Sequence, residues 1–349
     1  MKKIIKQLLI GSFALLTVTS CSKNDDDDPK PPAEKQTEIY TGGFVLSSAG
    51  GTTTHIATLW ENGVAQQLSN TESWVNKVLV VGNDVYAVGR EYQGSKSVAK
   101  LWKNGVATSS ISSSNNTEAF TCAVSASGDV YILVREWSNI VNEYKVLKNN
   151  IPVALNHTNA NTVIFPYDVF VSGSDVYVSG SEYSSATNLV KAVVWKNGII
   201  SSLADVSANA QNEARKIFVS DNNVYAVGSE AQPNGNNIVV LWKNGVPTSI
   251  TDGTKDGSVY ALCVSGNDIY ITSSEYNHTT FNSVATLWKN GTPIFTRNGD
   301  DFSFTSVAVL NNNWYLIGDG LEVTLWKNGV QEAPAIQDAS VSSISVVEK

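Results

Sequence analysis

The sequence predicts an all-β protein folded as a seven-bladed β-propeller, with four antiparallel strands in each blade. The main observation is a box of six residues, most often Leu-Trp-Lys-Asn-Gly-Val, that occurs seven times. The copies begin at Leu59, Leu101, Val146, Val194, Leu241, Leu287 and Leu325. Their spacing of roughly 45 residues, with strand-like sequence between them, is typical of propeller blades. A second motif in each interval and incomplete repeats at the two ends of the chain support the same fold.

The box itself predicts a tight hairpin between the last two strands of a blade. Asn-Gly between alternating apolar residues favours a two-residue type I′ turn, because both turn positions need a positive φ. In the fourth repeat we expect strands at residues 169–172, 176–180, 191–195 and 199–203. The third copy departs from the consensus and has Asn149-Asn150 in place of Asn-Gly at the turn.

The second motif is a tyrosine in the second strand of every blade. The copies are Tyr40, Tyr86, Tyr131, Tyr177, Tyr225, Tyr270 and Tyr315, and a glycine follows soon after in five of them: Gly42, Gly89, Gly180, Gly228 and Gly318. A recurrent strand glycine predicts close approach by a neighbouring blade. The Trp and Tyr columns could be stacking platforms for a ligand, but their regular period favours packing between blades.

The two ends of the repeat region are incomplete in complementary ways. Residues 38–42 already match a second strand, so the first blade lacks its first strand. After the seventh box, residues 340–347 form an unassigned strand-like tail. Pairing this tail with blade one would remove the open sheet edges at the seam. We therefore expect residues 38–349 to form a ring closed by a C-terminal inner strand.

Residues 1–20 read as a signal peptide. Lys2, Lys3 and Lys6 precede the apolar run from Leu8 to Val18. The sequence Val18-Thr19-Ser20-Cys21 resembles the lipobox of bacterial lipoproteins. The resemblance implies cleavage before Cys21 and lipidation of its sulfur, with diacylglycerol and the palmitate typical of such anchors. An ordinary secretory signal with a chance cysteine is the alternative.

Residues 21–37 form an acidic, proline-rich tether. Four aspartates, 25–28, repel one another, and the prolines that follow favour extended chain. An acidic cluster directly after the lipidated cysteine resembles the export signal of surface lipoproteins in Bacteroidota. We expect an outer-membrane location exposed at the cell surface, with the periplasmic face as the alternative. No later apolar run approaches the length that spans a bilayer, so the membrane contact is the lipid alone.

The charge and cysteine content of the sequence exclude some classes of partner and covalent link. The net charge of −8 argues against nucleic acid, whose phosphates require clustered Lys and Arg. Cys122 and Cys263 are expected on inner strands of non-neighbouring blades, where a disulfide is disfavoured and free thiols pack as small apolar groups. We expect no cofactor and a monomer.

Residues 38–349 as a whole resemble bacterial lipoprotein propellers built from Trp-Lys-Asn-Gly repeats. The resemblance implies the architecture and carries over no activity. The repeat lacks the signatures of the WD40, Kelch, quinone-enzyme and sialidase propellers.

Binding is expected on the face that carries the longer connections between strands. One candidate set there is a column of glutamates at the end of the second strands: Glu91, Glu136, Glu182, Glu230 and Glu275. They could hold a cation or sugar hydroxyls. Their periodicity favours the other interpretation, in which each accepts hydrogen bonds from its own loop.

A second candidate set lies just before the first strands, near the mouth of the central channel. Its members are Trp74, Asn76, Lys77, Phe120, Tyr167, Asp168, Arg215, Lys216, Tyr260 and Phe304. They differ from blade to blade, as a ligand site requires, and their chemistry suits a carbohydrate or a peptide. Aromatic plugs of the inner strands are the alternative.

Catalytic and metal-binding patterns are scarce, and we assign no catalytic or metal residue. His55, His157 and His278 are isolated, and no nucleophile-elbow motif occurs. Carboxylate pairs could be assembled in space from Asp168, Glu182 or Glu230. The leading hypothesis is a binding or scaffolding lipoprotein of the outer membrane that recognises a glycan or a protein. The alternative is a hydrolase or lyase that acts on extracellular polysaccharide with carboxylates at the channel mouth.

Overall fold

The computed structural model describes residues 35–49, 52–205, 211–299, 302–332 and 338–349. These residues form 28 strands in seven sheets, each with four antiparallel strands. The predicted fold class is therefore confirmed. The predicted signal peptide, Cys21 and most of the predicted tether lie outside the described residues. Among the described residues, no helix is long and apolar enough to cross a membrane.

The strands of each blade follow the chain from the inside of the ring outward, except that blade 1 takes its inner strand from the C-terminus. Blade 1 contains β28 (Ala339–Glu348), β1 (Thr37–Ala49), β2 (Thr52–Glu61) and β3 (Val64–Gln67). Blade 2 contains β4 (Ser73–Val81), β5 (Asp84–Gln93), β6 (Lys96–Lys103) and β7 (Val106–Ile111). Blade 3 contains β8 (Asn116–Val124), β9 (Val130–Trp137), β10 (Asn142–Lys148) and β11 (Ile151–Val153). Blade 4 contains β12 (Thr162–Ser172), β13 (Asp175–Ser184), β14 (Leu189–Lys196) and β15 (Ile199–Ser202).

The remaining blades follow the same order. Blade 5 contains β16 (Asn212–Ser220), β17 (Asn223–Ala231), β18 (Asn237–Lys243) and β19 (Val246–Ser249). Blade 6 contains β20 (Asp256–Ser265), β21 (Asp268–Asn277), β22 (Asn282–Lys289) and β23 (Thr292–Asn298). Blade 7 contains β24 (Ser303–Leu310), β25 (Asn313–Asp319), β26 (Thr324–Lys327) and β27 (Val330–Gln331). In the fourth repeat β12, β13 and β14 are longer than expected, and β12 and β13 extend beyond the apolar runs visible in the sequence. β15 ends at Ser202, one residue before the predicted end.

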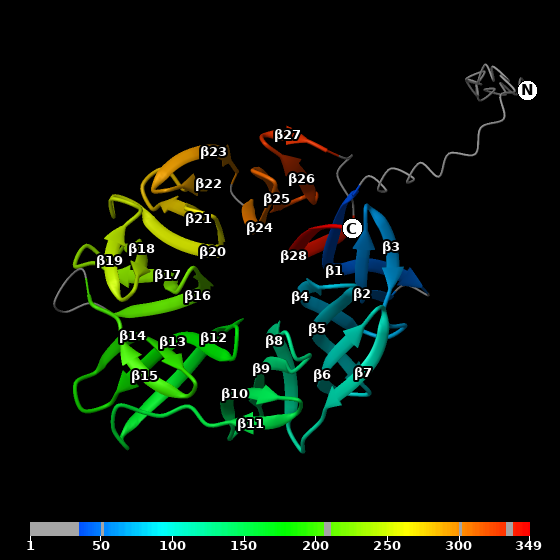
Figure 1. Ribbon diagram of the computed structural model, residues 1–349, viewed down its shortest axis with the longest axis horizontal. Helices are drawn as coiled ribbons and strands as arrows, with labels where there is room; N and C mark the ends of the chain where they lie inside the picture. The colour runs from blue at the N-terminus through cyan, green and yellow to red at the C-terminus, as the bar shows by residue number, and fades with distance from the viewer. Residues whose placement is uncertain (1–34, 50–51, 206–210, 300–301, 333–337) are drawn as a thin grey trace, which may run out of the picture. The chain divides into compact units, whose positions relative to one another are not determined.

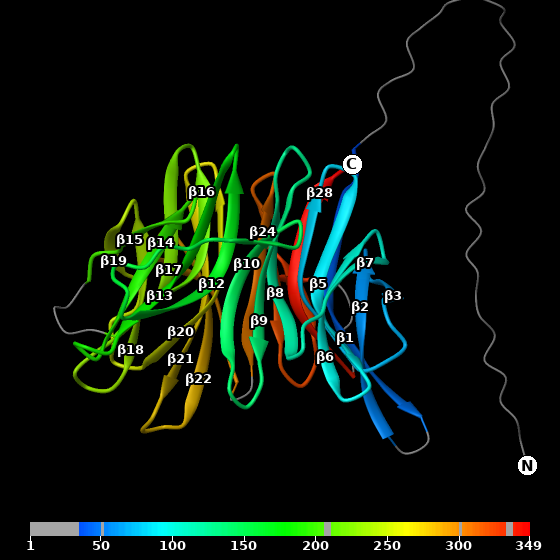
Figure 2. The ribbon, with the colours of Figure 1, turned by 90° about the horizontal axis from the view of Figure 1, so that it is seen from below.

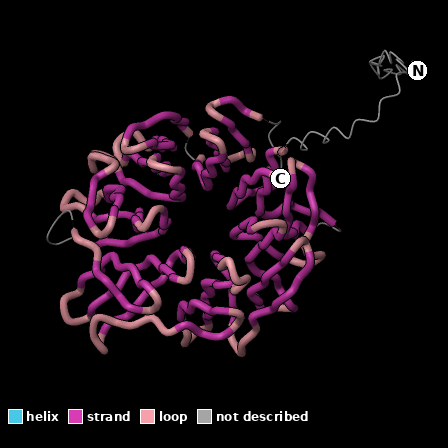
Figure 3. The backbone as a smooth tube through the Cα atoms, viewed as in Figure 1, coloured by secondary structure: helices cyan, strands magenta, loops and turns pink. Residues whose placement is uncertain are grey.

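The blades are arranged in a ring around a central axis, with the inner strands β28, β4, β8, β12, β16, β20 and β24 nearest to it (Figures 1 and 3). The strands run along the axis in the side view (Figure 2). Each blade therefore has one end on the face of the tight turns and one end on the face of the longer loops.

The ring closes as predicted, through β28. This strand pairs with β1 from Thr37–Glu348 to Val45–Ala339. The box of blade 1 has Glu61 where the other boxes have lysine, and the C-terminal Lys349 supplies the missing ammonium group. It lies over the ring of Tyr40 at 4.9 Å and pairs with Glu38 at 3.0 Å, while the Tyr40 hydroxyl donates to Glu61. In other blades the box lysine covers the tyrosine, as Lys103 covers Tyr86.

The Asn-Gly turns have the predicted conformation, with positive φ at both positions in all seven boxes. The box asparagine also fastens the outer hairpin to the inner one. Asn104 Oδ1, for example, accepts a hydrogen bond from the backbone N–H of Val85 at the start of β5. Equivalent bonds occur in all seven blades. The residue that favours the outer turn therefore also fixes the position of the outer hairpin against the second strand of its blade.

The hydrophobic core is divided into seven clusters, one between each pair of neighbouring blades. The box tryptophans 60, 102, 195, 242 and 326 are at most 3% exposed. The indole N–H of Trp195 donates to the carbonyl of Asn156 in the segment that arrives from blade 3. These contacts confirm that the Trp and Tyr columns pack the blades together. Cys122 and Cys263 are both free.

The strand glycines differ in part from the prediction. At Gly42 the close neighbours are Val75 and Val78 of the next blade, as expected. At Gly89 and Gly228, a Cβ would instead collide with a backbone carbonyl of the adjacent strand in the same blade, that of Trp74 and Glu213 respectively. The first-blade counterpart of these two glycines is Gly43, which faces the carbonyl of Ser340. Gly43, Gly89 and Gly228 therefore make room for a β-bulge in the inner strand of their own blade.

Candidate ligand-binding site

A β-bulge interrupts the same position of the inner strand in every blade. The bulged residues, which have no partner in the ladder, are Ser342, Asn76, Phe120, Tyr167, Arg215, Tyr260 and Thr305. A bulge re-aims side chains and bends the strand locally. The scaffold therefore presents a different side chain at one repeated position, and half of the second candidate set belongs to this column. These candidates lie inside the first strands, not before them as predicted.

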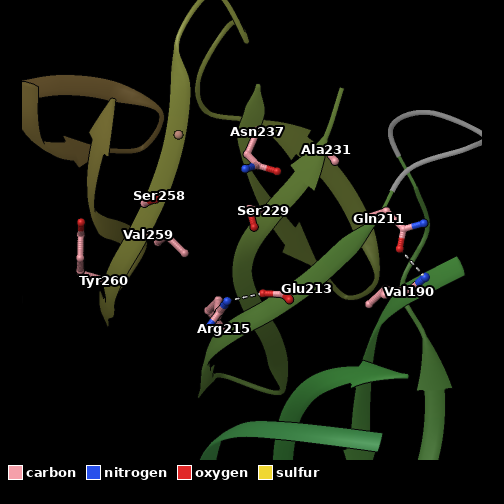
Figure 4. Close-up of a pocket in the computed structure, with 11 residues that line it drawn as sticks. Val190, Gln211, Glu213, Arg215, Ser229, Ala231, Asn237, Ser258, Val259 and Tyr260 are labelled. Carbon is pink, nitrogen blue, oxygen red and sulfur yellow. Dashed lines mark hydrogen bonds and ion pairs between the residues drawn. The ribbon is translucent and has the colours of Figure 1, made fainter. Parts of the chain in front are cut away.

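The loop ends of blades 4, 5 and 6 enclose a cavity of about 460 Å³ (Figure 4). Two of the bulged residues contribute to it, together with the starts of β14, β16, β18 and β20 and the end of β17. The lining residues are Val190, Gln211, Glu213, Arg215, Ser229, Ala231, Asn237, Gly257, Ser258, Val259 and Tyr260. A volume of this size is within the range of small-ligand sites.

Arg215 and Glu213 form the charged part of the wall. Their side chains meet at 2.5 Å and are both partly exposed. The guanidinium lies 4.6 Å from the centre of the Tyr167 ring, a cation–π contact. The Tyr167 hydroxyl contacts Glu213 and Ser181 at 3.3 Å each, and burial raises the pKa of this phenol. The Arg215 guanidinium is thus held at the cavity wall by Glu213 and the Tyr167 ring.

Tyr260 provides the aromatic part of the wall. Its hydroxyl contacts Ser274 Oγ at 3.1 Å, which fixes the ring at the edge of the cavity. Figure 4 shows Tyr260 on one side of the opening and the Arg215–Glu213 pair on another. The hydroxyls of Ser229 and Ser258 and the amide of Asn237 lie between these walls. The cavity therefore combines one ring, one ion pair and several neutral hydrogen-bonding groups.

Gly228 helps to shape this wall. A side chain there would collide with the carbonyl of Glu213, so only glycine lets β17 pair closely with β16 at the bulge. Glu213 and the bulged Arg215 then lie on the same part of the strand, with only Ala214 between them. Gln211 fixes the entry to β16, because its side chain accepts from Val190 N–H and donates to the carbonyl of Asn188.

Other members of the second candidate set lie away from this cavity. Trp74 is already covered, since Arg90 is 4.2 Å from the indole centre and the His55 ring is stacked on it at 5.0 Å. Phe120 packs near Tyr144 of β10. Phe304 is fully buried in the cluster between blades 6 and 7. The second candidate set therefore does not form a single site, because Trp74, Phe120 and Phe304 lie in blades 2, 3 and 7.

Three further members follow the bulged residue directly: Lys77 in β4, Asp168 in β12 and Lys216 in β16. Asn76, the bulged residue before Lys77, is used to join blades, since its amide donates to Glu118 and to the carbonyl of Ala119 in blade 3 at 2.9 Å each. None of these residues is among those that line the cavity.

The glutamate column makes contacts within the protein. Glu91 pairs with Lys100, and Glu136 pairs with Lys145 and accepts from Asn115. The Lys145 ammonium is the main cause that lowers the pKa of Glu136 to about 2. Burial opposes ionisation of Glu182, but hydrogen bonds from Thr158 and Thr162 outweigh it and lower its pKa.

The last two members of the column differ in environment. Glu230 is fully buried beside β16, opposite Asn212 in the ladder. Burial raises the pKa of Glu275, which has no close ion-pair partner among the described residues. A ligand role for the column stays a prediction, and the contacts above favour the scaffold interpretation for Glu91, Glu136 and Glu182.

Sequence reasoning missed most of the cavity wall: Gln211, Glu213, Ser229, Asn237 and Ser258 were not candidates. One signal was available. Trp74 is two residues before the bulge of its strand, and Glu213 and Ser258 occupy the same place in β16 and β20. Trp74 was a candidate from sequence. Taking the residue at the same repeat position in blades 5 and 6 would have identified Glu213 and Ser258 as well.

No family model matches the chain, and no curated protein matches its sequence. Solved structures do resemble it. The acylaminoacyl peptidase from Pyrococcus horikoshii is 10% identical, with 84% of this chain and 50% of that chain covered and a TM-score of 0.52. The β-propeller domain of the Trilobed protease from Pyrococcus furiosus is 10% identical, with 86% and 92% covered and a TM-score of 0.50.

TolB from Acinetobacter baumannii is a weaker match, at 10% identity and a TM-score of 0.43, with 88% of this chain and 66% of TolB covered. The chain thus spans half of the peptidase and about two thirds of TolB. At these identities the likeness shows the β-propeller fold alone. The Pyrococcus furiosus domain has an open velcro topology, whereas β28 closes the present ring.

Proposed function

We propose that this protein is a binding protein that holds a glycan in the cavity of blades 4 to 6. The observation that carries the proposal is the composition of the cavity wall. Hydroxyl, amide and guanidinium groups match the donors and acceptors of sugar hydroxyls, and the Tyr260 ring can stack on sugar C–H groups. The apolar lining residues Val190, Ala231 and Val259 are few and small, which suits an apolar peptide side chain less well than a sugar.

The number and contacts of the carboxylates in the cavity favour a binding function over glycoside cleavage. Glycosidases use a pair of carboxylates about 5–10 Å apart. Among the described residues that line the cavity, Glu213 is the only carboxylate, and Arg215 and Tyr167 already hold it. Of the carboxylates considered from sequence, Asp168 accepts bonds from Thr121 and Ile217, and Glu182 is 5% exposed and hydrogen-bonded to its loop.

We also propose that a lipid on Cys21 displays this cavity away from the outer membrane, at the cell surface. The support is the course of the chain. Gln36 exchanges backbone hydrogen bonds with Lys349 at the tight-turn ends of β1 and β28. The cavity lies at the opposite ends of the strands, on the loop face. A tether that enters on one face leaves the other free for a ligand.

Replacing Tyr260 or Arg215 by alanine is expected to weaken glycan binding without unfolding the protein, because both side chains are partly exposed. The purified protein and both variants should be compared on a glycan array and then by calorimetry with the glycans retained. We expect a loss of at least roughly tenfold in affinity for each variant.

Tyr276→Ala is the matched control, since Tyr276 is also a loop-face tyrosine of blade 6 but does not line the cavity. Equal loss in the control, or full binding by Tyr260→Ala and Arg215→Ala, would contradict the assignment. Release of a shortened glycan would instead indicate an enzyme.

Replacing Cys21 by serine is expected to move the protein from the membrane fraction to the soluble fraction and to end its labelling by palmitate. The reason is that the thioether is the proposed link to the lipid. Fractionation and metabolic labelling measure both effects. Protease treatment of intact cells then separates surface from periplasmic display. A Cys21→Ser protein that stays in the membrane fraction would refute the anchor.

A further inference from the structure

The position after each bulge carries a charged residue in three blades and an uncharged residue in the other four. Lys77, Asp168 and Lys216 are the charged members, in blades 2, 4 and 5. Ser343, Thr121, Ala261 and Ser306 hold the same position elsewhere. The three residues belong to β4, β12 and β16, which are among the strands nearest the axis of the ring (Figure 1).

Asp168 is fully engaged by its neighbours on both sides. Its Oδ1 accepts from the Thr121 hydroxyl of blade 3 at 2.9 Å and from its own neighbour Val169 N–H at 3.0 Å. Its Oδ2 accepts from the Ile217 N–H of blade 5 at 3.3 Å. The carboxylate therefore joins three blades, and no lysine lies within ion-pair distance of it in the described parts of the chain.

Lys77 and Lys216 have no hydrogen-bond or ion-pair partner anywhere in the described ranges. Two other lysines on blade strands, by contrast, have carboxylate partners: Lys100 pairs with Glu91 at 2.9 Å and Lys145 with Glu136 at 2.8 Å. An ammonium group offers three donors and no acceptor, so each unpartnered lysine needs oxygen atoms from elsewhere.

The two lysines share one electrostatic environment although blades 3 and 4 separate them. Lys216 keeps some accessible surface, yet burial is the main cause that lowers its pKa. Asp168 opposes this effect, and the positive charges of Lys77 and Arg215 add to it. Burial raises the pKa of the thiols of Cys122 in blade 3 and Cys263 in blade 6, and the positive charge of Lys77 opposes this increase in both. Geometry agrees with this: at the same strand position Ser343 and Asp168 accept hydrogen bonds from Val78 N–H and Ile217 N–H of the next blade, so the position lies along the inner wall that neighbouring blades share.

We propose that an oxyanion, such as a phosphate or carboxylate group, binds between Lys77 and Lys216 near the axis of the ring. Two like charges with reduced access to water repel each other and lack acceptors, and an oxyanion corrects both defects. The surrounding chain is acidic overall, with 32 Asp and Glu against 24 Lys and Arg. Two unpartnered lysines at one inner-strand position therefore contrast with the net charge of the chain. The site does not depend on glycan binding, because free phosphate is the first probe.

Thermal unfolding of the purified protein in sodium phosphate, against sodium chloride of equal ionic strength, tests the site. The melting temperature of the wild type is expected to rise with phosphate and to saturate, because a ligand that binds the folded state stabilises it. Lys77→Met and Lys216→Met should each weaken phosphate binding by roughly tenfold or more. Lys191→Met, which removes an exposed lysine of β14, is the matched control and should respond like the wild type.

Sodium glucuronate, tested in the same way, distinguishes a free ion from an acidic group carried by a sugar. A saturable, Lys77- and Lys216-dependent response to either probe supports the site and identifies its source. In the absence of both probes, Lys216→Met should melt above the wild type, since a poorly solvated charge has been removed. No saturable response in the wild type, or equal responses in all variants, would overturn the proposal. Lys77→Met alone suffices for the comparison if Lys216→Met fails to fold.

Discussion

Deletion of residues 338–349 is expected to abolish the cooperative unfolding of the propeller. The deletion removes all of β28, the inner strand of blade 1. Val341, Ser343 and Ile344 of this strand are at most 4% exposed. The Ser343 hydroxyl accepts from Val78 N–H of blade 2, and Ile344 N–H donates to Ser306 of blade 7. Without β28 the inner edge of β1 is left unpaired, which also favours aggregation.

Scanning calorimetry of the full-length protein and the deletion measures this effect. The control is deletion of residues 24–35, an equal length of chain that lies outside the compact unit of residues 36–349. We expect the control to melt like the wild type. If the C-terminal deletion also keeps its melting temperature, the ring does not depend on closure by β28.

Replacing Trp195 by alanine is expected to lower the free energy of unfolding by about 3–5 kcal/mol. Its side chain is fully buried in the cluster between blades 3 and 4. The substitution leaves a large cavity and removes the indole donor that satisfies the carbonyl of Asn156. Equilibrium unfolding in denaturant measures the change.

Trp288 is the matched control, because it is the box tryptophan of blade 6 but stays partly exposed, with its N–H on Ser273. Trp288→Ala should cost clearly less than Trp195→Ala. Equal losses at both positions would mean that burial does not decide the role of the box tryptophans.

The architecture could be predicted from sequence because its determinants are local and repeated. Asn104-Gly105 and its equivalents specify a type I′ turn by backbone preference alone, and seven copies set the number of blades. The closure was predictable for a different reason. Residues 38–42 and 340–347 are each one part of a blade that the other completes, so only one pairing leaves no open edge.

The candidate site was only partly predictable, because it depends on register and on contacts between blades. The bulge at Arg215 follows from the pairing of Ala214 with Gly228 and of Lys216 with Val227, which no sequence spacing reveals. For this reason Gly89 and Gly228 were assigned to the wrong neighbour. Arg215 and Tyr260 were found because they break the repeat. Ser229 and Asn237 come from other strands, and only the folded blades bring them to the same cavity.

Hydrogen–deuterium exchange with a glycan retained on the array tests the proposed site most directly. Binding in the cavity should slow exchange at residues 211–215, 229–231 and 257–260, the segments that line it. The Arg215→Ala variant should show no such protection. Protection confined to blades 1 to 3, or unchanged exchange at these three segments while the glycan is bound, would contradict a binding site between blades 4 and 6.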